Sequence, residues 1–171
     1  MARSGKNKSK SPAGNKAPSG PEIHNRKARK QYLILDTIEC GIALIGSEVK
    51  AVRDGRISLG EGFARVDEKS GELWLHNIHI SEYGPARGSI NAHDPTRKRK
   101  LLAHSREIRK LADLTRAKGT TLVPLKLYFK HGWAKLLLGV GQGKRKADVR
   151  ESEKKRDAER SIQRAMTRKR I

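Results

Sequence analysis

Lysines alternate with aromatic side chains within residues 121–140, and this spacing is suited to binding nucleic acid. His131-Gly132 separates two apolar-rich runs and predicts the two-residue turn of a β-hairpin. In the register that this turn sets, one face carries basic and aromatic side chains, namely Lys126, Tyr128, Lys130, Trp133 and Lys135. Ammonium groups bind phosphates and aromatic rings stack on bases, so this face is a candidate RNA-binding surface. The alternative for Trp133 is that it covers an edge of the core.

The other face of the same hairpin is apolar throughout, which predicts that it points into the core. The expected cross-strand pairs are Val123–Val140, Leu125–Leu138, Leu127–Leu136 and Phe129–Ala134. Since a slip of one residue would exchange the two faces, this pattern decides which side chains point outward.

The C-terminal residues 144–171 are a second candidate for binding an anionic partner. Arginines recur there every four residues, at Arg156, Arg160, Arg164 and Arg168. On a helix capped by Asp148 they form one row, and like charges at this spacing oppose a free helix by about 0.2–0.5 kcal/mol per pair. The apolar stripe that includes Ile162 and Met166 is thin. We therefore expect a tail that is disordered alone and helical against phosphates, the alternative being a permanently solvated helix.

Segments that contain residue types typical of catalysis lack the spacing that catalysis requires. Residues 139–144 resemble a phosphate-binding loop, but a Walker motif would need glycine in place of Leu138 and Ser or Thr in place of Arg145. His76 and His79 are three apart on a predicted strand, so their side chains diverge and do not share a metal. The sequence predicts no enzyme activity, no metal site and no cofactor.

The chain is strongly basic, with 39 Lys and Arg against 18 Asp and Glu and a net charge of +21. The excess is concentrated at both ends: residues 1–31 carry 9 basic residues against 1 acidic, and residues 144–171 carry 12 against 5. Nucleic acid is the commonest partner of a molecule with this charge pattern. The N-terminal stretch is rich in Lys, Ser, Gly and Pro, which predicts a disordered basic arm over residues 1–24.

Cys40 is the only cysteine, which excludes an internal disulfide and a multi-cysteine zinc site. A single thiol favours a reducing, cytoplasmic setting. No apolar run has the length of a membrane span, and the basic N-terminus lacks the apolar segment of a signal peptide. We therefore expect a cytoplasmic protein without membrane contact.

Short strands dominate the body of the chain between the two basic ends. Alternating and continuous apolar runs predict two strands within 32–46, and further strands at 63–66, 72–80, 121–130 and 133–140. Residues 69–71 predict the turn between the third and fourth strands. Residues 83–94 are rich in Gly, Ser, Asn and Pro and predict a long loop.

Two helices interrupt these strands. The first is expected to begin with Ser47 as its N-cap and to end at Gly55. The second is expected to be capped by His104 or Ser105 and to extend to Gly119, with a lysine in its last turn at position 118.

The predicted fold class is mainly β. Several short strands without regular strand–helix alternation argue against a parallel sheet and favour an OB-like antiparallel β-barrel with two to three short helices. The barrel is expected over residues 25–142, after the disordered arm of residues 1–24. The basic tail, helical when bound, is expected over residues 143–171.

Six short stretches, taken together, are similar to the SsrA-binding protein family, also called small protein B. They are Asn25-Arg26-Lys27-Ala28, Glu39 with Gly41-Ile42-Ala43-Leu44, Gly46-Ser47-Glu48-Val49-Lys50, Asp94-Pro95-Thr96-Arg97, Arg99-Lys100-Leu101-Leu102 and Gly143-Lys144-Arg145. Their order and spacing together are specific, and the resemblance covers nearly the whole chain from Asn25 onward.

The resemblance implies a six-stranded OB-like barrel that binds the tRNA-like end of transfer-messenger RNA. It implies that the complex enters a ribosome stalled on a message without a stop codon. The small ribosomal subunit is the second implied partner, because the tail would reach the decoding centre and fold in the vacant message channel. We expect the protein to act as a monomer.

Family members use residues matching Asn25, Glu39 and Leu102 for RNA binding, and the resemblance implies the same roles here. The basic residues Arg26, Lys27 and His104 belong to the same candidate RNA-binding set. The candidate ribosome-binding residues of the tail are Gly143, Lys144, Arg145, Lys146, Asp148, Arg150, Arg156, Arg160, Ile162, Arg164, Met166 and Arg168.

The tail departs from the family's usual His-Asp-Lys-Arg run and reads Ala147-Asp148-Val149-Arg150. The histidine that could stack on a ribosomal base is absent, and Val149 replaces a lysine. Arg145, Lys146 and Arg150 are the candidates to compensate for these changes.

Three other functions are compatible with the same composition. A structural ribosomal protein would share the basic ends, and a DNA-coating protein would share the charge. An RNA-processing enzyme would have to use His93, Asp94 or His104, although the His93-Asp94 pair has no second acidic cluster nearby.

Overall fold

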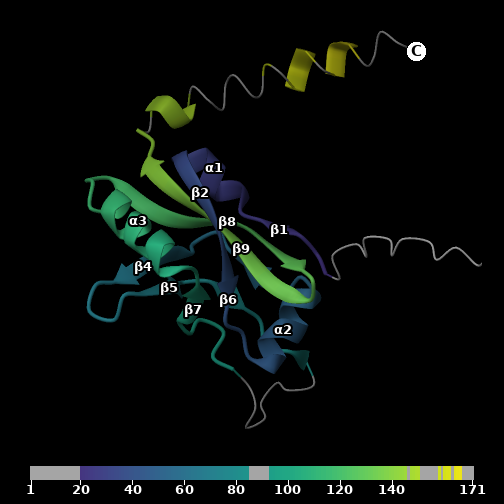
Figure 1. Cartoon of the computed structure of the whole chain (residues 1–171). Coiled ribbons are helices and arrows are strands. Elements are labelled where there is room, and N and C mark those ends of the chain that lie inside the picture. Colours follow the sequence, from purple (N-terminus) through teal and green to yellow (C-terminus); the bar gives the residue numbers. More distant parts are fainter. Residues whose placement is uncertain are drawn as a thin grey trace, which may run out of the picture.

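The computed structural model describes residues 20–84, 93–145, 147–150, 158, 160–162 and 164–166 (Figure 1). Its nine strands in these residues are β1 (Ile23–His24), β2 (Tyr32–Ile42), β3 (Ile57–Ser58), β4 (Phe63–Asp67), β5 (Glu72–His76), β6 (His79–Ile80), β7 (Arg99–Leu102), β8 (Thr120–Lys130) and β9 (Trp133–Gly143). Its labelled helices are α1 (Arg26–Gln31), α2 (Gly46–Arg53) and α3 (Ser105–Thr115).

The main sheet closes on itself and confirms the predicted OB-like barrel. Its strand order is β1-β8-β4-β5-β7-β2-β9, and β8 also pairs with β9 along most of its length. This second pairing of β8 joins β8, β4, β5, β7, β2 and β9 into a closed ring, and β1 is added to the ring at β8. Every pair in the ring is antiparallel. In Figure 1, α1 and α2 lie at opposite ends of the barrel and α3 lies on its flank.

The β8–β9 hairpin has the turn that the sequence predicts. His131 and Gly132 have φ values of 50° and 82°, the left-handed conformation that a two-residue turn with the twist of a hairpin requires. Next to the turn, Lys130 pairs with Trp133 and Tyr128 with Lys135, which is the register that this turn sets. The basic and aromatic face of the hairpin therefore points outward as predicted.

A bulge between Pro124 and Lys126 makes the predicted register wrong farther from the turn. Leu138 pairs with Pro124 rather than Leu125, and Val140 pairs with Leu122 rather than Val123. The bulge adds one residue to β8, which an alternating apolar pattern cannot reveal because residues 122–125 are all apolar or proline.

The bulge divides the apolar side chains of β8 between two clusters. Leu122, Leu127 and Phe129 lie in the barrel core, whereas Val123 and Leu125 pack with Ala28 in a small cluster under α1. A glycine opposite leaves room for the Leu125 side chain, because a Cβ atom at Gly139 would lie 2.8 Å from Leu125 Cδ1. The bulge thereby lets one strand support both the barrel and its first helix.

The prediction of two strands within 32–46 is wrong, because β2 is one strand of 11 residues. Gly41 does not end it: Gly41 pairs with Leu102 on one side and Lys135 on the other. Gly41 is instead a site of close packing, since a Cβ atom there would lie 3.3 Å from Leu102 Cβ. Glu39 and Cys40 lie in the same continuous strand.

Helix α2 begins earlier than predicted. Its N-cap is Ile45, and the Glu48 carboxylate accepts the Ile45 backbone N–H at 3.0 Å. Ser47, the expected cap, lies inside the helix and its Oγ is 3.1 Å from His93 Nδ1. Gly55 follows the helix with φ 74°, as predicted.

Helix α3 begins as predicted but ends at Thr115, so the expected extension to Gly119 is wrong. The His104 backbone N–H donates to Glu107 at the start of the helix. At its end, the hydroxyl of Thr115 donates to the Leu111 carbonyl and that of Thr120 donates to the Leu114 carbonyl. These hydroxyls satisfy carbonyls that another helical turn would otherwise use.

The predicted strand 72–80 is also divided, into β5 and β6. Asn77 between them has φ 57°, a left-handed conformation that asparagine tolerates better than most residues. Within the predicted loop 83–94, residues 85–92 lie outside the described part of the chain.

The last residues of the predicted N-terminal arm contact the sheet. Ile23 pairs with Leu127 and packs against the core, and His24 pairs with Lys126. The folded part of the chain therefore begins before Asn25, the expected boundary. Residues 1–19 lie outside the described part of the chain.

A buried ion network explains why two arginines of the basic run at 97–100 point inward. Glu48 and Arg99 both have 0% exposure, and Arg99 Nε donates to Glu48 Oε1 at 2.9 Å. Arg97 donates to the other carboxylate oxygen at 2.5 Å. The Arg99 guanidinium also donates to the carbonyls of Ile78, Arg97 and Pro95. These arginines hold α2 against the barrel and are not free for an outside partner.

Candidate nucleic-acid interface

One row of residues crosses four strands on the outside of the barrel and brings distant parts of the chain together. Leu102 of β7 pairs with Gly41 of β2, Gly41 with Lys135 of β9, and Lys135 with Tyr128 of β8. Paired residues share a face of the sheet, so these side chains lie on one surface. Leu102 is 55% exposed there although it is apolar.

Glu39 lies at the centre of this surface, surrounded by donors from the hairpin. The Tyr128 hydroxyl donates to Glu39 Oε2. Lys130 Nζ and Lys135 Nζ are 3.8 Å and 3.7 Å from Glu39 Oε1. The glutamate that the resemblance places in RNA binding and the hairpin face that the spacing predicts are therefore one site.

The surroundings of Glu39 keep its carboxylate charged. The hydrogen bond from Tyr128 holds the pKa of Glu39 below its usual value, aided by the charges of Lys130 and Lys135 and opposed by burial. Burial and the hydrogen bond to Glu39 raise the pKa of Tyr128 to about 12. The site therefore presents a carboxylate acceptor with a protonated phenol beside it.

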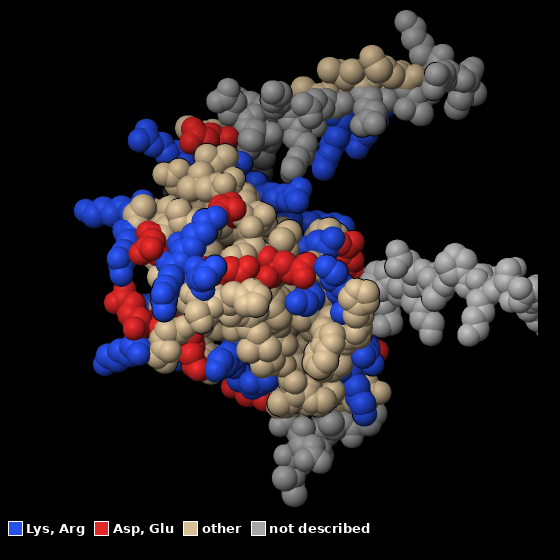
Figure 2. Space-filling model, viewed as in Figure 1, with Lys and Arg blue, Asp and Glu red and all other residues tan. Residues whose placement is uncertain are grey.

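The edge of the Glu39 surface carries lysine side chains and an exposed tryptophan ring. Trp133 is 74% exposed, which rules out its alternative role of covering the core, and it pairs with Lys130. Lys126 lies over the Tyr128 ring with its Nζ 4.9 Å from the ring centroid, and it forms an ion pair with Glu22. Figure 2 shows basic side chains spread over this view of the molecule, with a band of acidic side chains among them.

Asn25 is placed inside the protein rather than on this surface. It is 5% exposed, and its Nδ2 donates to the carbonyls of Leu59 and Pro124, each at 2.9 Å. Its Oδ1 accepts the Ala28 backbone N–H at 3.0 Å and caps α1. Its side chain thus has a positioning task, and a direct contact with RNA stays a prediction.

The other basic candidates belong to helices α1 and α3. Arg26 and Lys27 are exposed on α1, where Lys27 Nζ lies 2.5 Å from Glu61 Oε1. His104 is the exposed N-cap of α3. Their roles in RNA binding stay predictions.

The tail leaves the barrel at the end of β9. The Lys144 backbone N–H donates to the Gln31 carbonyl at 3.0 Å, which ties Gly143 and Lys144 to α1 and β2. Asp148 lies within the helical residues 147–150 and accepts the Arg145 backbone N–H at 3.3 Å. Asp148 therefore stabilises the start of a helix from inside its first turn, not as the expected N-cap.

The described residues farther along the tail are helical and exposed. They include Arg160, Ile162, Arg164 and Met166, while Arg150 ends the first described helical stretch. Lys146, Arg156 and Arg168 lie outside the described part of the chain. Binding of the tail to an anionic channel stays a prediction.

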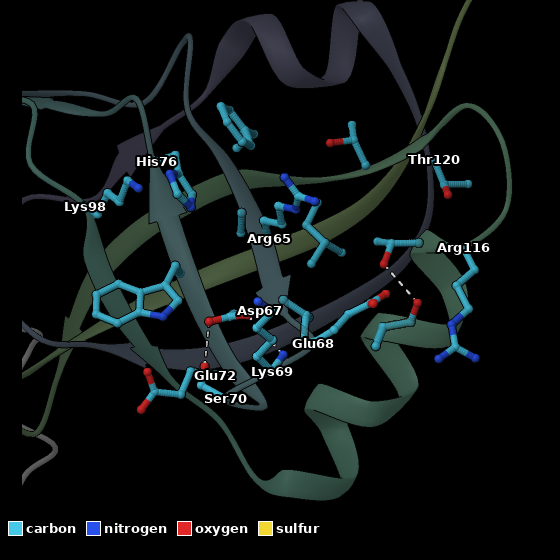
Figure 3. A pocket seen from close by; sticks show the side chains of 18 residues that line it. Arg65, Asp67, Glu68, Lys69, Ser70, Glu72, His76, Lys98, Arg116 and Thr120 are labelled. Atoms are coloured by element: carbon cyan, nitrogen blue, oxygen red, sulfur yellow. Dashed lines mark hydrogen bonds between the residues drawn. The ribbon is translucent and has the colours of Figure 1, made fainter.

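The sequence reasoning missed a groove between β4, β5 and α3, with a volume of about 1010 Å³ (Figure 3). Phe63 and His76 stack there at 5.2 Å between ring centroids. Figure 3 shows Lys98 and His76 at one end of the groove, Arg116 at the other end and Arg65 between them. Burial, with the charges of Lys98 and Arg65, lowers the pKa of His76. In the sequence, the side chains that alternate along 63–67 and 72–76 were the signal that could have indicated this groove.

The histidine and acid that an RNA-processing enzyme would need have structural partners. The buried His93 lies 3.1 Å from the Ile80 carbonyl through Nε2 and 3.1 Å from Ser47 Oγ through Nδ1. Asp94 accepts the backbone N–H and the hydroxyl of Thr96. Among the described residues, no three His, Cys, Asp or Glu side chains gather as metal ligands would. Burial raises the pKa of the Cys40 thiol to about 12.

No helix in the described residues is long and apolar enough to cross a membrane.

Comparison with known proteins confirms the family resemblance. The SmpB protein family matches residues 22–168. The SsrA-binding protein of Levilactobacillus brevis is 52% identical over 151 residues, which cover 88% of this chain and 94% of that protein. The SsrA-binding protein of Synechococcus elongatus is 55% identical over 144 residues, covering 84% and 92% respectively.

A solved structure supports the same conclusion. It comes from work called "tmRNA-SmpB: a journey to the center of the bacterial ribosome", and its chain superposes with a TM-score of 0.62 at 48% identity. The match covers 74% of this chain and 87% of that one. Sequence and fold agree: the chain belongs to the SmpB protein family.

Proposed function

We propose that this protein is an RNA-binding adaptor that binds the tRNA-like domain of transfer-messenger RNA and delivers it to stalled ribosomes for trans-translation. The observation that carries the proposal is the surface around Glu39, where a charged acceptor is surrounded by Tyr128, Lys130 and Lys135. The relatives are named as SsrA-binding proteins, and the solved structure is named as a tmRNA–SmpB structure. Both names support the same partner.

Recognition depends on shape and charge. The lysines of the Glu39 surface attract RNA phosphates, and the exposed rings and Leu102 provide contacts for unstacked bases or riboses. Glu39 repels phosphate, so its partner is a hydrogen-bond donor, either a base N–H or a ribose hydroxyl. A surface with both kinds of contact selects folded RNA over a bare polyanion.

The protein has no catalytic part in this function. Binding, orientation and release of RNA require no covalent step. His93 and Asp94, two residues of the enzyme alternative, have structural partners in Ile80, Ser47 and Thr96. We place the protein in the cytoplasm, where its RNA and ribosomes are, and expect it to act as a monomer.

The tail supplies the second contact, with the small ribosomal subunit. Its described residues from 158 onward are helical and exposed, with Arg160 and Arg164 one turn apart. A vacant message channel has anionic walls, which turn the mutual repulsion of such a row into attraction. The tail would thus report an empty channel, while the barrel holds the RNA.

Purification of the protein from its host, followed by sequencing of the bound RNA, tests the proposed function. One dominant RNA with a tRNA-like terminus is the expected result. A mixture that follows cellular RNA abundance, or ribosomal RNA in equal proportion to the protein after a high-salt wash, would contradict it and favour a structural ribosomal protein.

A further inference from the structure

Tyr128 and Glu39 meet because β9 brings their strands together. They are 89 residues apart in the chain, on β8 and β2, and β9 lies between these two strands. Tyr128 pairs with Lys135, Lys135 pairs with Gly41, and Glu39 lies two residues before Gly41 on the same face. The phenol therefore reaches across β9 to the carboxylate.

The three donors around Glu39 differ in how firmly they can hold it. Lys130 and Lys135 stand 3.8 Å and 3.7 Å from Oε1, beyond direct hydrogen-bond distance, on long flexible side chains. Tyr128 donates directly to Oε2 and has only two side-chain torsions. Its ring is further held by Lys126, whose Nζ is 4.9 Å from the ring centroid. The orientation of the carboxylate is thus set by the phenol, and the lysines supply charge.

A fixed carboxylate is useful where an RNA donor has to be recognised. The Glu39 side chain is 35% exposed, so part of the carboxylate remains open to a ligand. With one oxygen bound by Tyr128, the remaining acceptor positions point in set directions and match a base N–H or ribose hydroxyl only in one placement.

We infer that Tyr128 is a positioning residue, which fixes the Glu39 carboxylate for a hydrogen-bond donor of the bound RNA instead of serving mainly as a stacking platform. The inference rests on the proposed function, because it names how that same surface distinguishes its RNA.

Binding of a fluorescent tRNA-like fragment of transfer-messenger RNA, with duplex RNA of equal length as the reference, measures the effect on the full chain. Tyr128→Phe keeps the ring under Lys126 and removes only the hydroxyl. We expect it to weaken binding of the fragment about tenfold and to leave duplex RNA binding unchanged. The matched control is Tyr83→Phe, since Tyr83 also lies under a lysine, with Lys50 Nζ 5.3 Å from its ring centroid. Tyr83→Phe should leave both affinities unchanged.

A double-substitution cycle separates positioning from stacking. Because Tyr128 acts through Glu39, Tyr128→Phe should cause no further loss in the Glu39→Ala background. A normal affinity of Tyr128→Phe, or losses that add in the double variant, would overturn the inference while Glu39→Ala keeps its own effect. Failure of the unsubstituted protein to prefer the fragment over duplex RNA would overturn the proposed function as well. The fold is intact in both Phe variants if their thermal midpoints equal that of the unsubstituted protein.

Discussion

Glu39 and Glu48 have different roles, and the partners of each side chain decide its role. Glu39 is partly exposed among two lysines and a phenol, and it faces outward. Glu48 is fully buried, and both its oxygens are taken by Arg97 and Arg99. The first can bind a ligand, while the second holds α2 to the barrel.

Removal of the Glu48 charge should be costly, because it leaves two guanidinium groups without their counter-ion. We expect Glu48→Gln to lower the free energy of unfolding by about 3–5 kcal/mol, measured by urea denaturation. The matched control is Glu72→Gln, whose pair with Lys100 is partly exposed. It should cost less than about 1 kcal/mol. Equal losses in the two variants would show that the buried network does not hold the fold.

The same network should make stability depend on pH. Although burial alone would raise the pKa of Glu48, hydrogen bonds from Arg97 and Ile45 and the charge of Arg99 hold it below its usual 4.5. A lowered folded-state pKa gives stability that is complete above the unfolded value and is lost as pH falls through the folded value. The difference in unfolding free energy between the unsubstituted protein and Glu48→Gln should therefore be constant above about pH 5 and shrink below about pH 4.5. A difference that stays constant down to pH 3 would contradict this.

Residue types in the sequence predicted the outward lysines and rings but not their partners. Lys126, Tyr128 and Lys135 lie on the predicted face. The contact between Tyr128 and Glu39 depends on the pairing of β2 with β9, a long-range contact that no local pattern shows. Asn25 is a similar case, because its motif indicated RNA while its bonds to Leu59 and Pro124 are long-range.

At the level of elements, turns were more predictable than helix caps and strand lengths. The His131-Gly132 turn depends on local chemistry and was predicted correctly. The bulge at Leu125, the continuity of β2 through Gly41 and the early end of α3 depend on packing and on threonine hydroxyls from the next segment. Tertiary contacts of this kind override local signals.

The bulge in β8 should depend on the absence of a side chain opposite it. A Cβ atom at Gly139 would lie 2.8 Å from Leu125 Cδ1 and 3.1 Å from Cγ, so Gly139→Ala should destabilise the barrel by about 1–3 kcal/mol. Leu125→Val in the same chain should recover part of that loss, as thermal unfolding can measure. Additive losses in the double variant would show that the clash with Leu125 is not the cause.

At the scale of the whole molecule, barrel and tail should be separable. Truncation after Gly143 keeps every strand of the barrel and removes the basic tail. We expect the truncated protein to retain most of its affinity for the tRNA-like fragment and to lose rescue of stalled ribosomes in a reconstituted translation assay. If affinity and rescue fall together, the tail belongs to the RNA site.

The central claim is that the barrel surface around Glu39 recognises folded RNA and does more than attract negative charge. Competition binding tests it most directly: unlabelled tRNA-like fragment and duplex DNA of equal charge compete for the protein at about 150 mM salt, where non-specific attraction is weak. We expect the fragment to compete at least about tenfold more strongly, and Glu39→Ala to remove most of that preference. Equal competition by the two nucleic acids for the unsubstituted protein would contradict the account, as would a preference that Glu39→Ala leaves unchanged.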